Sequence, residues 1–217
     1  MSDEQSKPIH TNKAYAESLI DIRLDETVRS LRAEALARRI PVMDEAGLNF
    51  LLTVLAAKQP KKILEIGTAV GLSGAAMLKT CPDAKLVTIE LDEERYLEAK
   101  RNFAALGVAD RVTCHLGDAG EILRMMDANY DFILLDGPKA QYPAYLKELK
   151  RMIGTGGTIF IDDVLLFGWV GGQTPTPEKH KLFVAHMRSW LNELSQDEEF
   201  TTSVLDVGNG VALSVKV

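Results

Sequence analysis

Two acidic clusters in the second half of the sequence have the residue types of a metal site. Asp136 opens the segment Asp136-Gly137-Pro138-Lys139, and the pair Asp162-Asp163 follows the apolar run 158–161. Both clusters fall where a strand is expected to end, so their carboxylates are expected at neighbouring strand ends. Hard oxygen ligands of this kind suit Mg²⁺, Mn²⁺ or Ca²⁺. The alternative, loop aspartates that cap helices, is weaker for Asp162 and Asp163, because an apolar strand that delivers two charges needs something to neutralise them.

A glycine-containing segment earlier in the chain has the features of a turn that approaches a ligand closely. The short buried strand expected over 63–66 leads into Gly67-Thr68-Ala69-Val70-Gly71, and the glycines of this segment allow a tight turn. The spacing Gly67-x-x-x-Gly71-x-x-Gly74 differs from the G-x-G-x-x-G fingerprint of dinucleotide-binding proteins. This spacing disfavours a nicotinamide oxidoreductase, whose cofactor has a pyrophosphate to cradle.

Further polar residues follow in order along the same expected sheet edge. Glu90 ends the next strand, and a carboxylate there can accept hydrogen bonds from both hydroxyls of a ribose. Asp118 can hydrogen-bond an adenine amino group while the Ala119 amide faces the ring, and the Ser73 hydroxyl can reach a ligand's carboxylate. Each signal alone is more often a simple turn or a solvated side chain. Their succession at strand ends on one edge predicts a site for a nucleoside-type cofactor.

Strand and helix patterns alternate from residue 63 onward. They predict strands over 63–66, 86–90, 112–116, 130–136 and 156–162, and helices over 74–78, 93–106, 121–127, 142–152 and 178–194. Residues 201–205 and 210–217 are expected to close the sheet as an antiparallel pair around Val207-Gly208-Asn209-Gly210. This order predicts an α/β fold, with a mostly parallel sheet covered by helices on both faces.

The residues before this alternating region form an extension without the features of a separate domain. Apolar residues recur near helical spacing up to Pro41, which breaks the pattern, so this stretch is expected to be helical. Asp44 is expected to cap a further helix over 45–57. The chain is therefore predicted to be a single domain over 1–217, with residues 1–43 as an N-terminal helical extension.

The bulk composition limits the classes of protein to consider. A chain of 217 residues that is 46% hydrophobic can form one sizeable core. The net charge of −6 does not indicate a strongly basic nucleic-acid binder, although a local basic patch is compatible with it. Cys81 and Cys114 are far apart in sequence and are expected to be reduced. With no signal peptide and no apolar run near the roughly 20 residues of a membrane helix, the protein is expected to be cytoplasmic, soluble and without a membrane partner.

The sequence resembles the metal-dependent O-methyltransferases of the catechol and caffeoyl-CoA type. The matching residues are Glu65-Ile66-Gly67-Thr68 with Gly71 and Ser73, Thr88-Ile89-Glu90 and the segment 40–47, and the resemblance extends from about Pro41 to Val217. It implies a Rossmann-like class I methyltransferase fold with a seven-stranded sheet, and S-adenosylmethionine as the cofactor. The implied cofactor contacts are Met43, Glu65, Gly67, Thr68, Ser73, Glu90, Asp118, Ala119 and Asp136. For Met43, a core methionine at a helix start is the alternative.

The same resemblance gives roles to the two acidic clusters. The family has Asp-x-x-Lys after one strand and Asp-Asn after the next; its metal binds the substrate's hydroxyl oxygen, and the lysine is a candidate base for the hydroxyl proton. Asp136, Asp162 and Asp163 are thereby implied to be metal ligands, with Asp136 and Lys139 at the catalytic centre. The sequence departs from the family at Asp163, where Asn is usual, so the site gains negative charge.

Within the family, the sequence is most similar to the bacterial enzymes that methylate 5-hydroxyuridine in tRNA. The matching stretches are Val42-Met43 with Glu45-Ala46-Gly47, residues 58–69, Asp162-x-Val164-Leu165 and residues 207–210. The resemblance implies the tRNA anticodon loop as the partner and 5-methoxyuridine at the wobble position as the product. A small catechol-like or phenolic acyl-CoA substrate is the alternative, because its hydroxyl is similarly acidic. A non-catalytic cofactor-binding or RNA-binding module is the alternative of another class, and the intact acidic clusters argue against it.

An RNA partner requires basic residues for its phosphates. The candidates are Arg29, Arg32, Arg38 and Arg39 in the N-terminal extension, and Lys147, Lys150 and Arg151 in the helix 142–152; each could also belong to a solvated helix face. Phe167, Trp169 and Tyr142 could stack on a flipped-out base, line a pocket for a small phenol, or pack in the core. The family often forms dimers and the N-terminal stretch is amphipathic, so a homodimer is expected.

Overall fold

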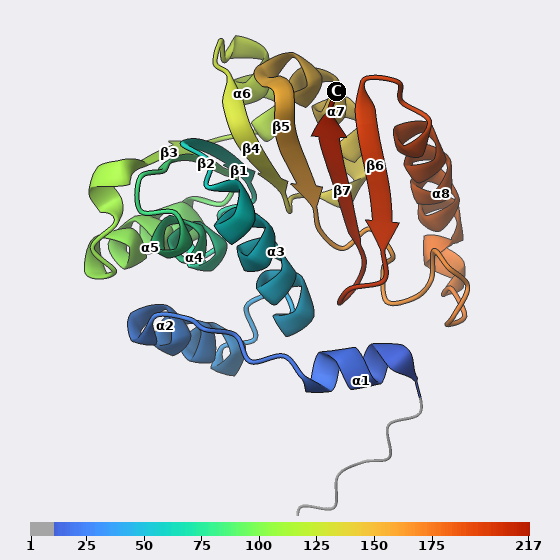
Figure 1. Cartoon of the computed structure of the whole chain (residues 1–217), viewed down its shortest axis with the longest axis horizontal. Helices are drawn as coiled ribbons and strands as arrows, with labels where there is room; N and C mark the ends of the chain where they lie inside the picture. Colours follow the sequence, from blue (N-terminus) through green and yellow to red (C-terminus); the bar gives the residue numbers. More distant parts are fainter. Residues whose placement is uncertain (1–10) are drawn as a thin grey trace, which may run out of the picture.

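A seven-stranded sheet forms the centre of the computed structural model, which describes residues 11–217 (Figure 1). Its strands are β1 (Lys62–Ile66), β2 (Lys85–Glu90), β3 (Val112–Leu116), β4 (Tyr130–Leu135), β5 (Ile153–Ile161), β6 (Phe200–Leu205) and β7 (Val211–Lys216). Their order across the sheet is β3-β2-β1-β4-β5-β7-β6. The first five strands are parallel, and β7 pairs antiparallel with both β5 and β6. The predicted Rossmann-like α/β fold with a closing antiparallel hairpin is confirmed.

Helices cover both faces of the sheet. They are α1 (Asn12–Ser18), α2 (Glu26–Ala37), α3 (Glu45–Lys58), α4 (Leu72–Thr80), α5 (Glu93–Ala105), α6 (Ala119–Met125), α7 (Tyr142–Met152) and α8 (Lys181–Ser195), with short 3-10 turns η1 (Ala109–Arg111), η2 (Lys139–Gln141) and η3 (Glu178–His180). Alternate residues of β4 pack into two hydrophobic cores, one on each face of the sheet. Phe132 and Leu134 belong to the first core, with residues of α2 to α5, and Ile133 and Leu135 belong to the second core, with residues of α6 to α8. Burial on both faces explains why residues 132–135 of this central strand are all apolar.

The N-terminal extension differs from the single helical stretch predicted up to Pro41. The structure has two helices, α1 and α2, joined by a non-helical connector over 19–25. Asp25 starts α2, because its Oδ1 accepts a hydrogen bond from the Thr27 amide at 3.0 Å. Ile22 in the connector is buried in the first core, so its apolar side chain serves tertiary packing rather than a helix face. The part of the prediction that concerns residues 1–10 lies outside the described residues.

The ends of β1, β4 and β5 are held tightly together. The Asp136 amide donates to the Ile66 carbonyl at 3.0 Å, and the Asp162 amide donates to the Leu135 carbonyl at 3.0 Å. Gly67 has a φ of +100°, and a Cβ at this position would lie 2.2 Å from the Asp136 carbonyl oxygen. Only glycine allows this approach. The glycine turn and the first acidic cluster are therefore neighbours in the fold.

Two further sequence expectations can be compared with the fold. Cys81 is buried and Cys114 lies half-buried on β3, and both are free thiols. Burial raises the pKa of each thiol to about 11, so the thiols are unreactive at neutral pH. Over residues 11–217, no helix combines the length and the apolar character needed to cross a membrane.

Candidate active site

A pocket of 480 Å³ opens at the carboxyl ends of the parallel strands. Its volume lies within the range of small-molecule sites, roughly 300–1,000 Å³. The predicted residues on its wall are Met43, Gly67, Glu90, Asp136, Lys139, Asp162 and Asp163. The fold thus brings both acidic clusters, the lysine and part of the predicted cofactor set to a single site.

Lys139 links the two acidic clusters at this site. Its Nζ lies 2.9 Å from Asp163 Oδ2 and 3.4 Å from Asp136 Oδ1. Burial lowers the pKa of Lys139, but the charges of Asp136 and Asp163 outweigh that effect and hold the pKa above its ordinary value. In the structure Lys139 is therefore an ammonium group shared by two carboxylates.

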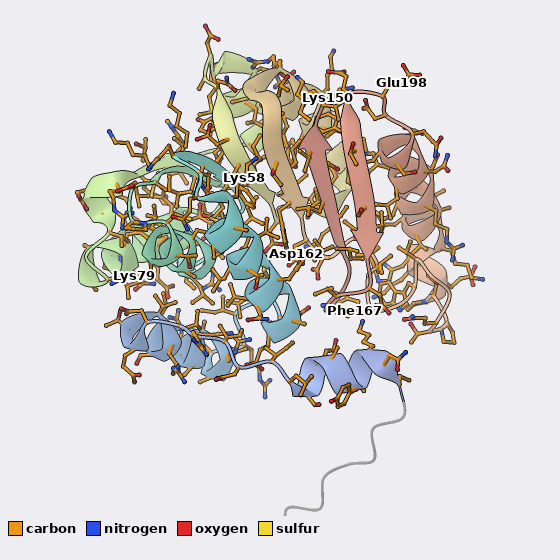
Figure 2. The ribbon with its side chains drawn as sticks, viewed as in Figure 1. Lys58, Lys79, Lys150, Asp162, Phe167 and Glu198 are labelled. Atoms are coloured by element: carbon orange, nitrogen blue, oxygen red, sulfur yellow. The ribbon has the colours of Figure 1, made fainter. Side chains whose placement is uncertain are left out.

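Asp162 is the most buried carboxylate of the site. Its side chain is 2% exposed, and its Oδ1 has no hydrogen-bond partner among the described residues. Burial, followed by the charges of Asp136 and Asp163, raises the pKa of Asp162 to about 8. Figure 2 shows Asp162 and Phe167 at the end of the sheet nearer α1, with Lys150 at the opposite end. A buried oxygen without a partner is costly unless a ligand satisfies it.

The carboxylates have suitable chemistry for a divalent cation, but Lys139 lies among them. Within residues 11–217, no group of three or more His, Cys, Asp or Glu side chains is arranged to hold a metal ion. The unpartnered Asp162 Oδ1 and the nearby Asp136 and Asp163 oxygens are the hard donors that Mg²⁺ prefers. The residue set therefore fits such an ion in donor type, and metal ligation by Asp136, Asp162 and Asp163 stays a prediction.

Glu90 shapes one side of the pocket through backbone contacts. Its Oε2 accepts from the Ala69 amide at 2.8 Å, and its Oε1 accepts from the Leu91 and Asp92 amides, both at 2.9 Å. These bonds fix the glycine turn against the end of β2. A carboxylate offers about four acceptor positions, so Glu90 retains the capacity to accept from ligand hydroxyls.

Glu65, Thr68 and Ser73 form a buried network beneath the glycine turn rather than part of the pocket wall. Glu65 is completely buried and accepts hydrogen bonds from Ser73 Oγ at 2.5 Å and Thr88 Oγ1 at 2.7 Å. The Thr68 hydroxyl lies 2.6 Å from that of Thr88. Burial raises the pKa of Glu65 to about 7. In the structure these side chains tie β1 to β2 and α4, and Ser73 donates to Glu65 rather than facing the pocket.

Asp118 and Ala119 also lie outside the pocket wall. Asp118 is exposed and caps α6, because its Oδ1 accepts from the Glu121 amide at 3.0 Å. Ala119 is buried in the second core. The Gly117 amide donates to the Glu90 carbonyl at 2.9 Å, which places this segment beside the end of β2. A cofactor contact by Asp118 and Ala119 remains a prediction.

The three aromatic residues near the acidic clusters have different environments. Tyr142 is fully buried, and its hydroxyl donates toward the carbonyl oxygens of Leu135 and Asp162 at 3.4 and 3.3 Å. Of the three roles considered for these aromatic residues, Tyr142 therefore has that of packing in the core. Phe167 lines the pocket and is 59% exposed. Trp169 lies behind it, with its ring centroid 5.4 Å from that of Phe167 and 5.1 Å from that of His180, on which it stacks.

Several of the basic residues predicted for RNA binding are paired with carboxylates. Arg38 pairs with Glu34 and Glu98, Lys150 with Asp197 and Glu199, and Arg151 with Glu148. Within residues 11–217, no ion pair is found for Arg29, Arg32, Arg39 or Lys147. The free basic charge available for phosphates is therefore smaller than the sequence suggests.

Three pocket residues with polar side chains, Asp44, Arg95 and Asn209, have no role at the site predicted from the sequence. The sequence indicates only a helix cap for Asp44 and a place in the closing turn for Asn209. Arg95 lies on the first turn of α5, shortly after Glu90, so its place in the helix that follows β2 is a usable signal. The sequence around Asn209 does not indicate that it lies at the pocket. Asn209 reaches the pocket only because the fold brings the turn between β6 and β7 next to it.

The O-methyltransferase family model matches residues 14–217, so the chain belongs to this family. A Mycobacterium tuberculosis protein named as a candidate O-methyltransferase is 30% identical over 159 residues, which are 72% of this chain and 69% of that protein. A candidate caffeoyl-CoA O-methyltransferase from Staphylococcus aureus has a TM-score of 0.85 at 27% identity, with 95% of this chain and 99% of that chain covered.

A further solved structure is similar in fold. It is an O-methyltransferase from Streptomyces achromogenes that is involved in tomaymycin synthesis and was solved in complex with SAM. Its TM-score is 0.78 at 24% identity, with 94% of this chain and 95% of that chain covered. Together with the family match, this likeness confirms the predicted class I methyltransferase fold.

Proposed function

We propose that the protein transfers a methyl group from S-adenosylmethionine to the hydroxyl oxygen of a planar ring, with the help of a divalent cation. The observation that carries the proposal is the 480 Å³ pocket, where Lys139 contacts Asp136 and Asp163 beside the unpartnered Oδ1 of Asp162. Membership of the O-methyltransferase family supports the reaction. The SAM complex of the Streptomyces relative supports the choice of cofactor.

The cofactor half of the pocket has Met43, Gly67, Ala69 and Glu90 on its wall. Gly67 and Ala69 both have positive φ angles, so the chain turns sharply here and its backbone faces the pocket. The remaining acceptor positions of Glu90 suit a ribose, and Met43 supplies apolar contact. S-adenosylmethionine bound here would supply an electrophilic methyl group.

The acceptor half contains the acidic clusters and Lys139. A divalent cation held by Asp136, Asp162 and Asp163 would supply Lewis acidity toward the hydroxyl oxygen. In its neutral form, Lys139 would take the proton from the acceptor hydroxyl. Asp136 and Asp163 oppose that form by holding the pKa of Lys139 high, so catalysis requires their charges to be neutralised. Close placement of the hydroxyl and the methyl donor then provides much of the rate.

For the acceptor, we propose 5-hydroxyuridine in the tRNA anticodon loop. One support is the resemblance of the sequence to the bacterial enzymes that methylate 5-hydroxyuridine in tRNA. The other is Phe167, which offers an exposed aromatic face to an unstacked base. A small catechol-like or phenolic acyl-CoA substrate is the second candidate. It is favoured by the net charge of −6, the internal pairing of Arg38, Lys150 and Arg151, and the name of the Staphylococcus relative.

The test is methyl transfer from labelled S-adenosylmethionine to two probes, an anticodon stem-loop that contains 5-hydroxyuridine and free catechol. A stem-loop of the same sequence with uridine is the control. We expect transfer to the hydroxyuridine RNA alone, loss of transfer with a chelator, and recovery with Mg²⁺. Transfer to catechol but not to RNA would overturn the tRNA acceptor. Transfer that persists in chelator and in Asp162→Ala would overturn the metal, and failure to bind the cofactor would overturn the whole proposal.

A further inference from the structure

The turn between β6 and β7, residues 207–210, holds the loop that follows β5. The Leu165 amide donates to the Asn209 carbonyl, and the Val164 amide donates to the Gly210 carbonyl, both at 2.9 Å. These residues come directly after the second acidic cluster and precede Phe167 in the chain. The 207–210 turn therefore sets the position of the loop on the acceptor side of the pocket.

The same turn also holds α1. Lys13 Nζ donates to the Gly208 carbonyl at 2.9 Å and forms an ion pair with Asp206. None of the seven residues of α1 is buried, so packing does little to fix this helix. The contact made by Lys13 is therefore a main attachment of α1 to the rest of the molecule.

Asp44 joins the turn to the start of α3 with both of its carboxylate oxygens. Oδ1 accepts from the Gly47 amide at 2.8 Å and caps the helix, and Oδ2 accepts from the Asn209 amide at 2.9 Å. A Cβ built on Gly47 would lie 3.5 Å from both Asp44 Oδ1 and Asp162 Oδ1, so the helix start also adjoins the acidic cluster. Asp44 lines the main pocket and a neighbouring pocket of 440 Å³ that Lys13 also lines.

The contact between Asp44 and the turn leaves no space for a side chain. Gly208 has a φ of +55°, and a Cβ there would lie 2.0 Å from Asp44 Oδ2. Both the backbone conformation and the close approach of the carboxylate therefore require glycine. A helix cap alone would need only one oxygen of Asp44. The second oxygen and the glycine opposite it exist for the connection to the turn.

We propose that Asp44 is a positioning residue for the acceptor half of the pocket and acts through the 207–210 turn. It fixes the start of α3, and with it the preceding Met43 on the cofactor side, relative to the loop with Phe167 on the acceptor side. The inference rests on the proposed function, which defines these two sides. Loss of the connection should therefore weaken acceptor binding and leave cofactor binding intact.

The decisive variant is Asp44→Ser, which separates the cap from the connection. A serine hydroxyl can still accept from the Gly47 amide as a helix cap, but it has no second oxygen for the Asn209 amide. For the hydroxyuridine stem-loop and catechol probes, we expect KM of the methylated probe to rise about tenfold, as expected when a hydrogen bond to a charged group is lost. The Kd of S-adenosylmethionine should stay within about twofold, and exchange of the Leu165 and Asn209 amides should accelerate.

Two matched controls separate this effect from general destabilisation. Asp25→Ser alters the cap of α2, which among the described residues makes no backbone hydrogen bond to the turn, and should leave KM unchanged. Gly208→Ala should raise KM as Asp44→Ser does. Gly107→Ala introduces the same side chain at a φ of +68° with no atom within 4 Å, and should leave KM unchanged.

Several outcomes would overturn the inference. If Asp44→Ser accelerates amide exchange without raising KM, the connection is structural only. If neither quantity changes, Asp44 is only a helix cap. If the wild-type protein methylates neither probe, the proposed function fails. Amide exchange in the protein bound to S-adenosylmethionine then tests whether Asp44 holds the loop: unchanged exchange overturns the inference, and accelerated exchange supports the connection on which the inference depends.

Discussion

At the scale of single residues, Glu65 combines complete burial with an ionisable group. Ser73 and Thr88 donate to its carboxylate and favour the charged form, but burial has the larger effect and raises its pKa to about 7. The ordinary value is 4.5. Since the pKa is higher in the folded state than in the unfolded state, the fold favours the neutral form. This contribution to stability is complete below pH 4.5 and is lost as the pH rises through 7.

Replacement of Glu65 by Gln should remove this pH dependence. The free energy of unfolding of Glu65→Gln, relative to wild type, should increase between pH 4.5 and 7 and level off above that range. The increase should be at most about 3 kcal/mol, because one pKa unit corresponds to about 1.4 kcal/mol. Urea denaturation across this pH range measures it. Glu121→Gln, which replaces an exposed carboxylate on α6, is the control. If the free energy of unfolding of wild type and of Glu65→Gln depended on pH in the same way, the raised pKa of Glu65 would be contradicted.

Phe167 is the residue on which the proposed planar acceptor depends most directly. Phe167 and the preceding Leu166 have φ angles of +58° and +49°, an uncommon conformation for such side chains. Strain of this kind is often retained at functional sites. Here it presents an exposed aromatic ring to the pocket, with Trp169 stacked on His180 behind it.

We expect Phe167→Ala to raise KM for the methylated acceptor about tenfold, because stacking on an aromatic side chain is worth about 1–3 kcal/mol. Phe167→Tyr should retain the wild-type KM, and the Kd of S-adenosylmethionine should not change in either variant. Steady-state kinetics and calorimetry provide these values. Leu182→Ala, an exposed apolar residue away from the pocket wall, is the control. An unchanged KM in Phe167→Ala would show that the ring makes no contact with the acceptor.

At the scale of elements, the turn after β1 determines how the two halves of the site meet. Gly67→Ala would place a Cβ 2.2 Å from the Asp136 carbonyl oxygen, and the turn would have to move away from the end of β4. We expect a loss of roughly 2–4 kcal/mol in the free energy of unfolding and a large loss of cofactor affinity. Gly156→Ala, at a φ of +78° with open space around it, should cost about 1 kcal/mol. Equal losses for the two variants would mean that backbone strain alone is responsible.

The sequence predicts the regular elements well where local pattern and tertiary packing agree. The helix predicted over 142–152 coincides with α7, and the predicted Asp44 cap starts α3. The sequence does not predict the N-terminal break, because Ile20, Ile22 and Leu24 continue the apolar spacing. In the structure the chain leaves the helix here, buries Ile22 and packs the partly buried Ile20 and Leu24 against the same core. Packing that depends on distant residues has no local signal.

The same distinction applies to the site. Asp136, Lys139, Asp162 and Asp163 were placed together correctly because parallel strands end at one edge of a sheet. The second hydrogen bond of Asp44 could not be predicted, because its partner Asn209 is 165 residues away. Nor could the internal role of Ser73, since the choice between Glu65 and a ligand depends on side-chain orientation.

At the scale of the whole molecule, α1 and its C-cap carry apolar side chains that residues 11–217 leave exposed. Tyr15 and Leu19 are four residues apart and are 55% and 65% exposed. Residues with this spacing at the end of a helix lie on the same side. Figure 1 shows α1 at the end of the sheet, where it is separated from the main layers of helices. An exposed apolar surface of this kind is typical of a contact between subunits.

We therefore expect a homodimer in which α1 contributes to the interface. The double variant Tyr15→Ser and Leu19→Ser should raise the dissociation constant of the dimer tenfold or more, because burial of two large side chains contributes roughly 3 kcal/mol. Sedimentation velocity over a range of protein concentrations measures this constant. Met125→Ser and Leu182→Ser remove apolar side chains of α6 and α8 that are even more exposed, and they should leave the dissociation constant unchanged. A wild-type protein that stays monomeric at all concentrations would contradict the dimer, and a dimer that tolerates the α1 variant would assign its interface to another surface.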